Sequence, residues 1–425
     1  MTKIRGGGAG RWRTGPRAAI FGAVTSSLPD AGGHGGRRAA VLAGFLGWTL
    51  DAFDFFLVVM TLTAIAQEFH RSDAAIAYSL GLTLAFRPVG ALIFGLLSDR
   101  FGRRTPLMIN LVFYAVIEVL TGFSRSYGAF LVLRALFGIG MGGEWGVGAS
   151  LVMEKVPARW RGLVSGFLQQ GYALGYLLAA AAYALVFPRW GWRPLFFLGG
   201  LPALLALFVR ARVTESEVWH RTRERTWHGL AGVLVKQAPL FLYLTVLMAL
   251  MNMTSHGTQD LYPTFLQRTW HLGPGTRSTI TIIAMVGALL GGVVCGAWSQ
   301  SFGRRRTIIT ALAGAVVVVP LWAYAPSLPL LVLGAFLMQF AVQGAWGVIP
   351  AHITELTPDQ VRGALPGFAY QCGAFIAGTM PSLQAKVAGS LGYPATMALS
   401  AGTAFVLCAL VAGLGRERRG IVYGG

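Results

Sequence analysis

The chain has 425 residues, of which 55% are hydrophobic and only 12% are charged. A soluble globular domain carries about 25% charged residues and cannot bury many long apolar segments, so the composition excludes an ordinary soluble protein. The formal net charge of +19 would suit a nucleic-acid-binding protein, but the placement of the basic residues argues against that class.

Long uncharged stretches alternate with short basic segments along the chain. A helix needs about 20 apolar residues to cross a bilayer, so the pattern predicts an all-α membrane protein with twelve transmembrane helices. The expected ranges are 40–68, 77–98, 106–124, 128–153, 163–187, 193–210, 238–266, 278–298, 307–325, 328–353, 364–387 and 393–414. Residues 1–38 are rich in Gly and Arg and lack a long apolar run, so they are predicted to be a disordered tail without a signal peptide.

Most lysines and arginines fall in the segments that lie on one side of the membrane if the N-terminus is cytoplasmic. This asymmetry follows the positive-inside rule, so the basic charge is a topology signal. The expected partner is the lipid bilayer and not nucleic acid. Both termini are predicted to be cytoplasmic, and the absence of organelle signals favours a bacterial inner (plasma) membrane.

The two halves of the sequence resemble each other at one fixed offset of 201 residues. The segment 95–104 recurs at 296–305, and the pattern E-x-x-P-x-x-x-R at 154–161 recurs at 355–362. A duplicated six-helix unit is therefore predicted. Its parts are a cytoplasmic tail (1–38), an N-terminal bundle (39–210), a cytoplasmic linker (211–237), a C-terminal bundle (238–415) and a second tail (416–425). The linker is polar and basic and carries two tryptophans, which is compatible with an amphipathic helix on the membrane surface.

Few ionisable residues were found inside the predicted helices. Each is a functional hypothesis, because a charged side chain at the bilayer centre costs at least about 2.5–3.5 kcal/mol. They are Asp51, Asp54, Arg87, Arg134, Glu144, His256 and Asp260.

Arg87 is the natural partner of a carboxylate, because its planar guanidinium binds two oxygens at once. An arginine near the midplane of a membrane-spanning bundle indicates a site for an anion, and the alternative is an internal ion pair with Asp51 or Asp54. His256 and Asp260 are spaced i, i+4 and could share a proton, which suits proton coupling. The alternative for this pair is a structural hydrogen bond.

Two motifs resemble signatures of the major facilitator superfamily. D-R-x-G-R-R occupies 99–104, with a weaker copy at 300–305 in which Gln300 replaces the acid, and R-x-x-x-G-x-G occupies 134–140. The resemblance implies twelve helices in two pseudo-symmetric six-helix bundles, and a protein that works as a monomer. It also implies a cytoplasmic latch in which carboxylates accept hydrogen bonds from helix ends and pair with arginines. The expected latch residues are Asp99, Arg103, Glu154, Arg161, Arg304, Glu355 and Arg362.

Two further stretches resemble the sialate/lactate–proton symporter subgroup of that superfamily. They are G-W-T-L-D-A-F-D-F-F at 47–56 and N-M-T-S-H-G-T-Q-D-L-Y-P-T at 252–264, and the second fills every fixed position of the monocarboxylate members. The resemblance implies symport of a proton with a small anionic monocarboxylate such as L-lactate or pyruvate, with no cofactor and no metal. The substrate-binding candidates are Arg87, Asn252, His256, Gln259, Gln343 and Tyr172. The proton-coupling candidates are Asp51, Asp54, His256, Asp260 and Glu144.

Other functions are weaker alternatives. Sialate or an aromatic acid would keep the fold and the coupling, although the first predicted helix offers a sugar acid few hydrogen-bonding groups. Efflux by proton antiport would favour a Pro-rich signature on the fifth helix, where Gly171 and Gly175 occur without proline. A transporter-like sensor would need a long cytoplasmic output domain. An enzyme is not predicted, since the sequence shows no Ser-His-Asp set, metal-ligand spacing or phosphate loop.

Overall fold

The computed structural model describes residues 34–227 and 235–424, and the regular elements within these ranges are all helical. The first half forms α2 (His34–Glu68), α3 (Asp73–Phe101), α4 (Arg104–Gly122), α5 (Tyr127–Lys155), η1 (Ala158–Trp160), α6 (Arg161–Gln169), α7 (Gly171–Trp190), α8 (Arg193–Leu198) and α9 (Leu201–Arg212). The linker contains α10 (Glu217–Trp227). The second half forms α12 (Ala238–Gln259), α13 (Tyr262–Arg268), α14 (Pro274–Phe302), α15 (Arg304–Ala323), α16 (Leu328–Leu356), η2 (Asp359–Val361), α17 (Leu365–Ala377), α18 (Met380–Leu391) and α19 (Tyr393–Leu414).

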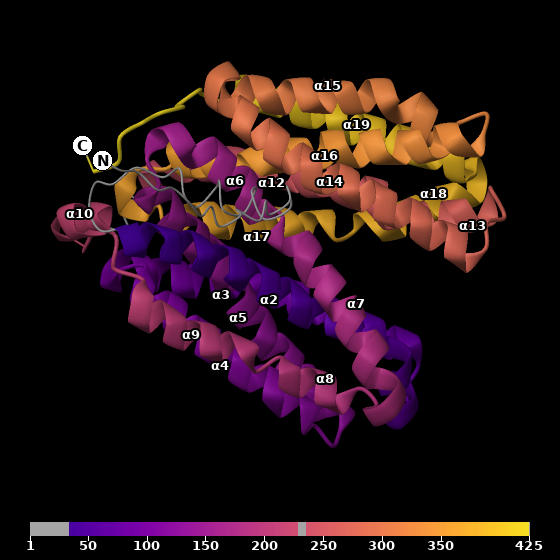
Figure 1. Ribbon diagram of the computed structural model, residues 1–425, viewed down its shortest axis with the longest axis horizontal. Coiled ribbons are helices and arrows are strands. Elements are labelled where there is room, and N and C mark those ends of the chain that lie inside the picture. The colour runs from indigo at the N-terminus through magenta and orange to yellow at the C-terminus, as the bar shows by residue number, and fades with distance from the viewer. Residues whose placement is uncertain (1–33, 228–234, 425) are drawn as a thin grey trace, which may run out of the picture.

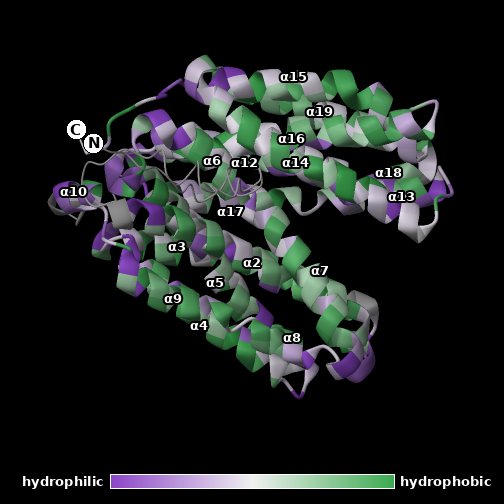
Figure 2. Ribbon diagram, in the orientation of Figure 1, coloured by the Kyte–Doolittle hydropathy of each residue, from purple (hydrophilic) through white to green (hydrophobic). Residues whose placement is uncertain are grey.

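The two halves form two groups of long helices that run in similar directions (Figure 1). The groups lie close together at the end that carries α10 and the segment after α19, and they diverge toward the end that carries α8 and α13. We call these the linker end and the far end. Hydrophobic residues cover the middle of the helices and hydrophilic residues gather at both ends (Figure 2), as is expected of helices that cross a bilayer.

Eleven helical segments of the described residues are long and apolar enough to cross a membrane. The predicted helix 364–387 is not among them, because the structure divides it into α17 and α18 at residues 378–379. The continuous helices predicted over 163–187, 193–210 and 238–266 are also wrong in detail, since each is divided in two.

Prolines explain three of these four breaks. Pro202, Pro263 and Pro381 lie in the first turns of α9, α13 and α18. A proline has no N–H to donate to the preceding turn, but its fixed φ suits the first turn of a new helix. The prediction of unbroken helices used hydrophobicity, which does not take the missing N–H of proline into account.

The first helix begins earlier than the sequence predicted. A tail was expected over 1–38, but α2 starts at His34, while residues 1–33 lie outside the described part of the chain. A Cβ atom at Gly36 would lie 3.0 Å from Oγ1 of Thr214, so this first turn packs against the chain that follows α9. This tertiary contact is not visible in the local composition.

The helix packing repeats the offset of the sequence. In the first half, a Cβ atom at Gly90 of α3 would lie 1.7 Å from the carbonyl oxygen of Ile139 in α5. In the second half, a Cβ atom at Gly291 of α14 would lie 2.0 Å from the carbonyl oxygen of Phe340 in α16. Both pairs need glycine for the two backbones to approach so closely. The same helix crossing is therefore built twice, 201 residues apart.

Candidate functional site

A cavity of about 230 Å³ lies between the two halves. The first half contributes aromatic side chains, including Phe56, Tyr172 and Tyr176, and the second half contributes polar side chains from α12 and α16. Four of the predicted site residues line this cavity. They are Tyr172, Gln259, Asp260 and Gln343.

The polar wall is a network of amides and hydroxyls. Nε2 of Gln259 donates to Oε1 of Gln339 at 2.9 Å, and Nε2 of Gln339 donates to Oγ1 of Thr258 at 3.2 Å. Nε2 of Gln343 lies 3.4 Å from Oγ of Ser255. The motif at 252–264 thus meets α16 at the cavity, and these groups can donate hydrogen bonds to an oxyanion or accept them from a hydroxyl.

His256 and Asp260 interact as their spacing predicted. Nδ1 of His256 lies 2.9 Å from Oδ2 of Asp260, and both side chains are 33% exposed. Asp260 lines the cavity where α12 ends, whereas His256 does not line it. Asn252, another candidate of this motif, also lies outside the lining, and its Nδ2 donates to the carbonyl of Met248 at 2.8 Å.

An aromatic cluster adjoins the cavity through Tyr172. We define it as Trp48, Trp145, Tyr172, Trp346 and Tyr370. The ring centroids of Trp145 and Tyr370 lie 4.6 Å apart, and those of Trp48 and Tyr172 lie 5.8 Å apart. Because Trp145 belongs to α5 and Tyr370 to α17, the cluster joins the two halves.

Arg87 lies beside Tyr370 of this aromatic cluster and does not line the cavity. Its guanidinium carbon is 6.0 Å from the ring centroid of Tyr370, and the side chain is buried. Its Nε and Nη2 atoms have no hydrogen-bond partner in the described ranges. The structure shows no ion pair within 4 Å joining Arg87 to the described residues Asp51 and Asp54, which was the alternative expected from the sequence.

Three carboxyl groups are completely enclosed in the first half. Asp51, Asp54 and Glu144 are at most 1% exposed, and none of their carboxyl oxygens has a hydrogen-bond partner within residues 34–227 and 235–424. A Cβ atom at Gly47 would lie 2.2 Å from Oε1 of Glu144, so the carboxyl of Glu144 occupies the space that this glycine leaves on α2.

Glu118 is a further buried acid that the sequence reading missed. It lies on α4, it is fully buried, and it forms an ion pair with Arg134 of α5. A Cβ atom at Gly199 would lie 2.2 Å from Cγ of Glu118 and 2.9 Å from Oδ1 of Asp54, so the two acids adjoin the break between α8 and α9. The sequence could have identified Glu118, because it is an acid inside a predicted helix, as Asp51 is.

At the linker end, Asp99 joins the two halves. Its Oδ1 accepts a hydrogen bond from the backbone N–H of Gly363 at 2.8 Å, and its Oδ2 accepts one from Ala364 at 3.0 Å. Arg103 lies 2.7 Å from Asp99 and 3.0 Å from Glu154. One carboxylate therefore holds the N-terminal end of α17 from the second half against α3.

The second copy of this arrangement is built around Arg304. Its guanidinium pairs with Glu355 at 3.0 Å, and its Nη2 donates to Oε1 of Gln300 at 2.9 Å. Gln300, at the position equivalent to Asp99, accepts one backbone hydrogen bond from Gly162 at 3.2 Å. Arg161 lies 3.8 Å from Glu355 of the other half.

Arg362 is the last of the expected latch residues. It lies 3.7 Å from Glu154 across the interface between the halves, and its Nε donates to the carbonyl of Thr354 at 3.1 Å. All seven expected latch residues are thus gathered at the linker end, and their role in the transport cycle stays a prediction.

Replacing Asp99 and its equivalent Gln300 by alanine is expected to destabilise the closed linker end to different extents. Asp99→Ala breaks a buried ion pair and leaves the backbone N–H groups of Gly363 and Ala364 without their acceptor, which costs about 3–5 kcal/mol in the closed form of the linker end. Gln300→Ala removes one neutral hydrogen bond, worth about 1 kcal/mol, and one from the guanidinium of Arg304, but it leaves the ion pair of Arg304 with Glu355 in place. Labelling of an engineered cysteine at the linker end should therefore increase more for Asp99→Ala. Equal labelling of both variants would contradict an unequal latch.

Comparison with known proteins places the chain in a family. The sequence matches the model of the Major Facilitator Superfamily over residues 44–262 and 242–420. It is 27% identical over 372 residues to a protein of Saccharomyces cerevisiae named "Carboxylic acid transporter protein homolog", covering 81% of this chain and 60% of that longer protein. It is 31% identical over 342 residues to the "Probable 4-methylmuconolactone transporter" of Cupriavidus pinatubonensis, covering 79% of this chain and 80% of that one.

A solved structure supports the fold alone. The proton:xylose symporter XylE, bound to 6-bromo-6-deoxy-D-glucose, superposes with a TM-score of 0.73 at 19% sequence identity. The match covers 91% of this chain and 98% of that one. The all-helical fold with two pseudo-symmetric halves agrees with the family match. The chain belongs to the Major Facilitator Superfamily, and it is a multi-pass membrane protein that transports a metabolite and is not an enzyme.

Proposed function

We propose that this protein is a proton-coupled symporter of a small monocarboxylate, such as lactate or pyruvate. The observation that carries the proposal is the cavity between the halves, whose polar wall is built by the motif at 252–264. Its volume of about 230 Å³ is below the range of about 300–1,000 Å³ that is common for drug-sized ligands, which favours a small substrate. The names of two relatives, a carboxylic acid transporter homolog and a methylmuconolactone transporter, support an organic acid as substrate.

An aromatic or unsaturated ring acid is the second candidate. Phe56, Tyr172, Tyr176 and Trp322 line the same cavity, and such rings stack well on a flat substrate. This candidate keeps the fold and the proton coupling and changes only the substrate. Sialate is less well supported, because a bulky sugar acid needs more space and more hydrogen-bonding partners.

Arg87 is proposed to bind the substrate carboxylate after the aromatic cluster rearranges. The guanidinium lies beneath the ring of Tyr370 with two nitrogens unpaired in the described chain, so it is available once that ring moves. The amides of Gln259 and Gln343 would hold the acid before that movement, and Tyr172 forms part of both the cavity and the cluster. Substrate would thus pass from an amide-lined cavity to a buried cation.

The coupling proton is proposed to bind to a carboxyl group of α2. At membrane depth, the described part of the first half buries four carboxyl groups, Asp51, Asp54, Glu118 and Glu144, against two arginines, Arg87 and Arg134. Enclosing an uncompensated carboxylate costs several kcal/mol, so two of the four carboxyl groups would be protonated while the site is closed. Glu118 is already paired with Arg134, which leaves Asp51 and Asp54 as the best proton carriers, with Glu144 beside them.

The pair of His256 and Asp260 is proposed to sense the substrate at the cavity wall. Both side chains are partly exposed, and Asp260 would repel an anion unless it shares a proton with His256. Proton uptake by this pair would therefore favour entry of the carboxylate. The halves would then rock about the site while the latch residues at the linker end exchange partners, and the basic linker end would face the cytoplasm.

Uptake is expected to follow the pH gradient and to respond little to membrane potential, because one proton and one anion carry no net charge together. Labelled lactate can be offered to proteoliposomes with an imposed pH gradient, in competition with pyruvate, sialate and benzoate. Lactate accumulation that a protonophore abolishes and pyruvate inhibits would support the proposal. Uptake that rises with membrane potential at a fixed pH gradient would contradict electroneutral symport, and transport of benzoate without lactate would favour the second candidate.

A further inference from the structure

The segment that follows α19 crosses the interface between the two halves at the linker end. Nη1 of Arg161 donates to the carbonyl oxygen of Ile421 at 2.6 Å, and this arginine belongs to the first half. The N–H of Gly424 donates to Oδ2 of Asp359 at 2.8 Å, and this carboxylate belongs to the second half. Five residues at the end of the described chain are therefore bound by both halves.

Tyr423 is the centre of this contact. Its ring lies between two guanidinium groups, with the central carbon of Arg161 at 3.6 Å and that of Arg362 at 3.8 Å from the ring centroid. The residue is only 5% exposed, and its hydroxyl lies 3.4 Å from Oγ1 of Thr354. Burial raises the pKa of Tyr423 although both arginines lower it, so the phenol is neutral at pH 7 and attracts the cations through its ring face.

The two arginines occupy equivalent positions in the repeat, 201 residues apart. The ring therefore lies where the two halves face each other, with one arginine from each half on it. Without the ring, two like charges from opposite halves would approach each other with less compensation. Separation of the halves must remove at least one arginine from the ring.

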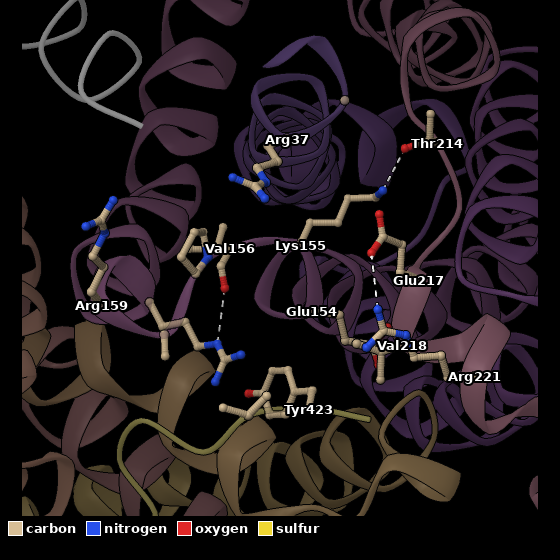
Figure 3. A pocket seen from close by; sticks show the side chains of 15 residues that line it. Arg37, Glu154, Lys155, Val156, Arg159, Thr214, Glu217, Val218, Arg221 and Tyr423 are labelled. Carbon is tan, nitrogen blue, oxygen red and sulfur yellow. Dashed lines mark hydrogen bonds and ion pairs between the residues drawn. The ribbon is translucent and has the colours of Figure 1, made fainter. Parts of the chain in front are cut away.

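A second observation is that the segment adjoins an open space. A cavity of about 520 Å³ lies beside it, lined by residues of α2, α5, α10 and the segment itself (Figure 3). In Figure 3, Tyr423 lies at the edge of this cavity, on the opposite side from Thr214 and Lys155. The segment thus packs through Tyr423 and Ile421 and adjoins an open space, into which it can be released.

We propose that Gly420–Gly424 is a conformational strap that binds only while the linker end is closed, and that it stabilises the form open toward the far end. Arg161, Arg362 and Asp359 form its receptor, and opening of the linker end releases it. The strap is independent of the substrate and of the proton site, so it can be tested separately from the proposed function.

The test uses the full chain with its three cysteines, all reduced and none in a disulfide, replaced by alanine. Arg159→Cys and Arg306→Cys then place one spin label on each half at the linker end, where both residues are exposed. Distance distributions are measured in lipid nanodiscs for three chains: the parent, Tyr423→Ala and Tyr423→Phe. Phe keeps the ring between the arginines and removes only the hydroxyl, so it is the matched control.

Tyr423→Ala is expected to raise the ratio of the long-distance to the short-distance population about tenfold, because it removes two cation–π contacts and a buried ring. Tyr423→Phe is expected to change that ratio less than about twofold, since a hydroxyl contact at 3.4 Å is weak. A ratio for Tyr423→Ala equal to that of the parent would overturn the strap, and so would an equal effect of both variants.

A second variant tests the proposal even if Tyr423→Ala misfolds. A chain that ends at Arg419 lacks the strap but keeps every membrane-spanning helix. It should elute and melt like the parent while showing the same shift in distances as Tyr423→Ala. A truncated chain that is folded and keeps the parent distribution would overturn the proposal even if Tyr423→Ala cannot be purified.

Discussion

Asp51→Asn and Asp54→Asn are each expected to abolish accumulation of substrate against its gradient while leaving exchange across the membrane in place. Asparagine has nearly the shape of a protonated aspartic acid, so the variant should mimic the loaded carrier and should not release a proton. A gradient of one pH unit can sustain about a tenfold accumulation, since 1.4 kcal/mol corresponds to a factor of ten. That accumulation should fall to the level of passive equilibration.

The measurement compares two assays on the same proteoliposomes. Uptake driven by a pH gradient reports coupling, and counterflow with unlabelled substrate inside reports movement of the loaded carrier. Glu68→Gln is the matched control, because Glu68 is an acid of the same helix that lies at the surface beside Arg193. If both Asn variants accumulate substrate like the parent, the proton is carried elsewhere, and His256 and Asp260 become the next residues to test.

Arg87→Lys is expected to reduce both uptake and counterflow severely. A lysine keeps the charge but cannot offer two parallel N–H groups to a carboxylate. Loss of hydrogen bonds to a charged group costs about 1.5–3 kcal/mol, which corresponds to roughly 10- to 150-fold in affinity. Binding of labelled substrate to purified protein and counterflow should both show this loss.

The location of Arg87 makes this prediction discriminating. In the structure the side chain lies outside the cavity lining and beside Tyr370, so a substrate that stays in the cavity would not touch it. Gln259→Leu serves as the comparison, because Gln259 lines the cavity directly. Unchanged affinity in Arg87→Lys with weakened affinity in Gln259→Leu would remove Arg87 from the binding site and restrict recognition to the cavity.

Features that repeat in the sequence were predicted well. The positions of most helical segments and the division into two halves follow from apolar runs and from one offset of 201 residues. These features depend on local composition or on symmetry, which a single sequence displays. The contact of His256 with Asp260 also follows from spacing, because residues four apart share a face of a helix.

Features that depend on lateral packing were not predicted. Spacing gave the depth of Arg87 in the membrane but could not show that it lies outside the cavity and against an aromatic ring from the other half. The breaks between α12 and α13 and between α17 and α18 were missed, because a hydrophobicity profile does not distinguish a proline in the first turn of a new helix from other apolar residues. Glu118 was overlooked in an otherwise apolar helix, although its partner Arg134 had been singled out.

The aromatic cluster gives the protein an internal optical reporter. The protein has twelve tryptophans, and three of them belong to the cluster. The ring centroids of Trp48, Trp145 and Trp346 all lie within 6.3 Å of the ring centroid of Tyr370. Tyr370 belongs to the second half, while Trp48 and Trp145 belong to the first. Any movement of one half past the other must change the surroundings of these indoles. Tryptophan emission should therefore shift when substrate is added, so that turnover can be followed in real time on unlabelled protein.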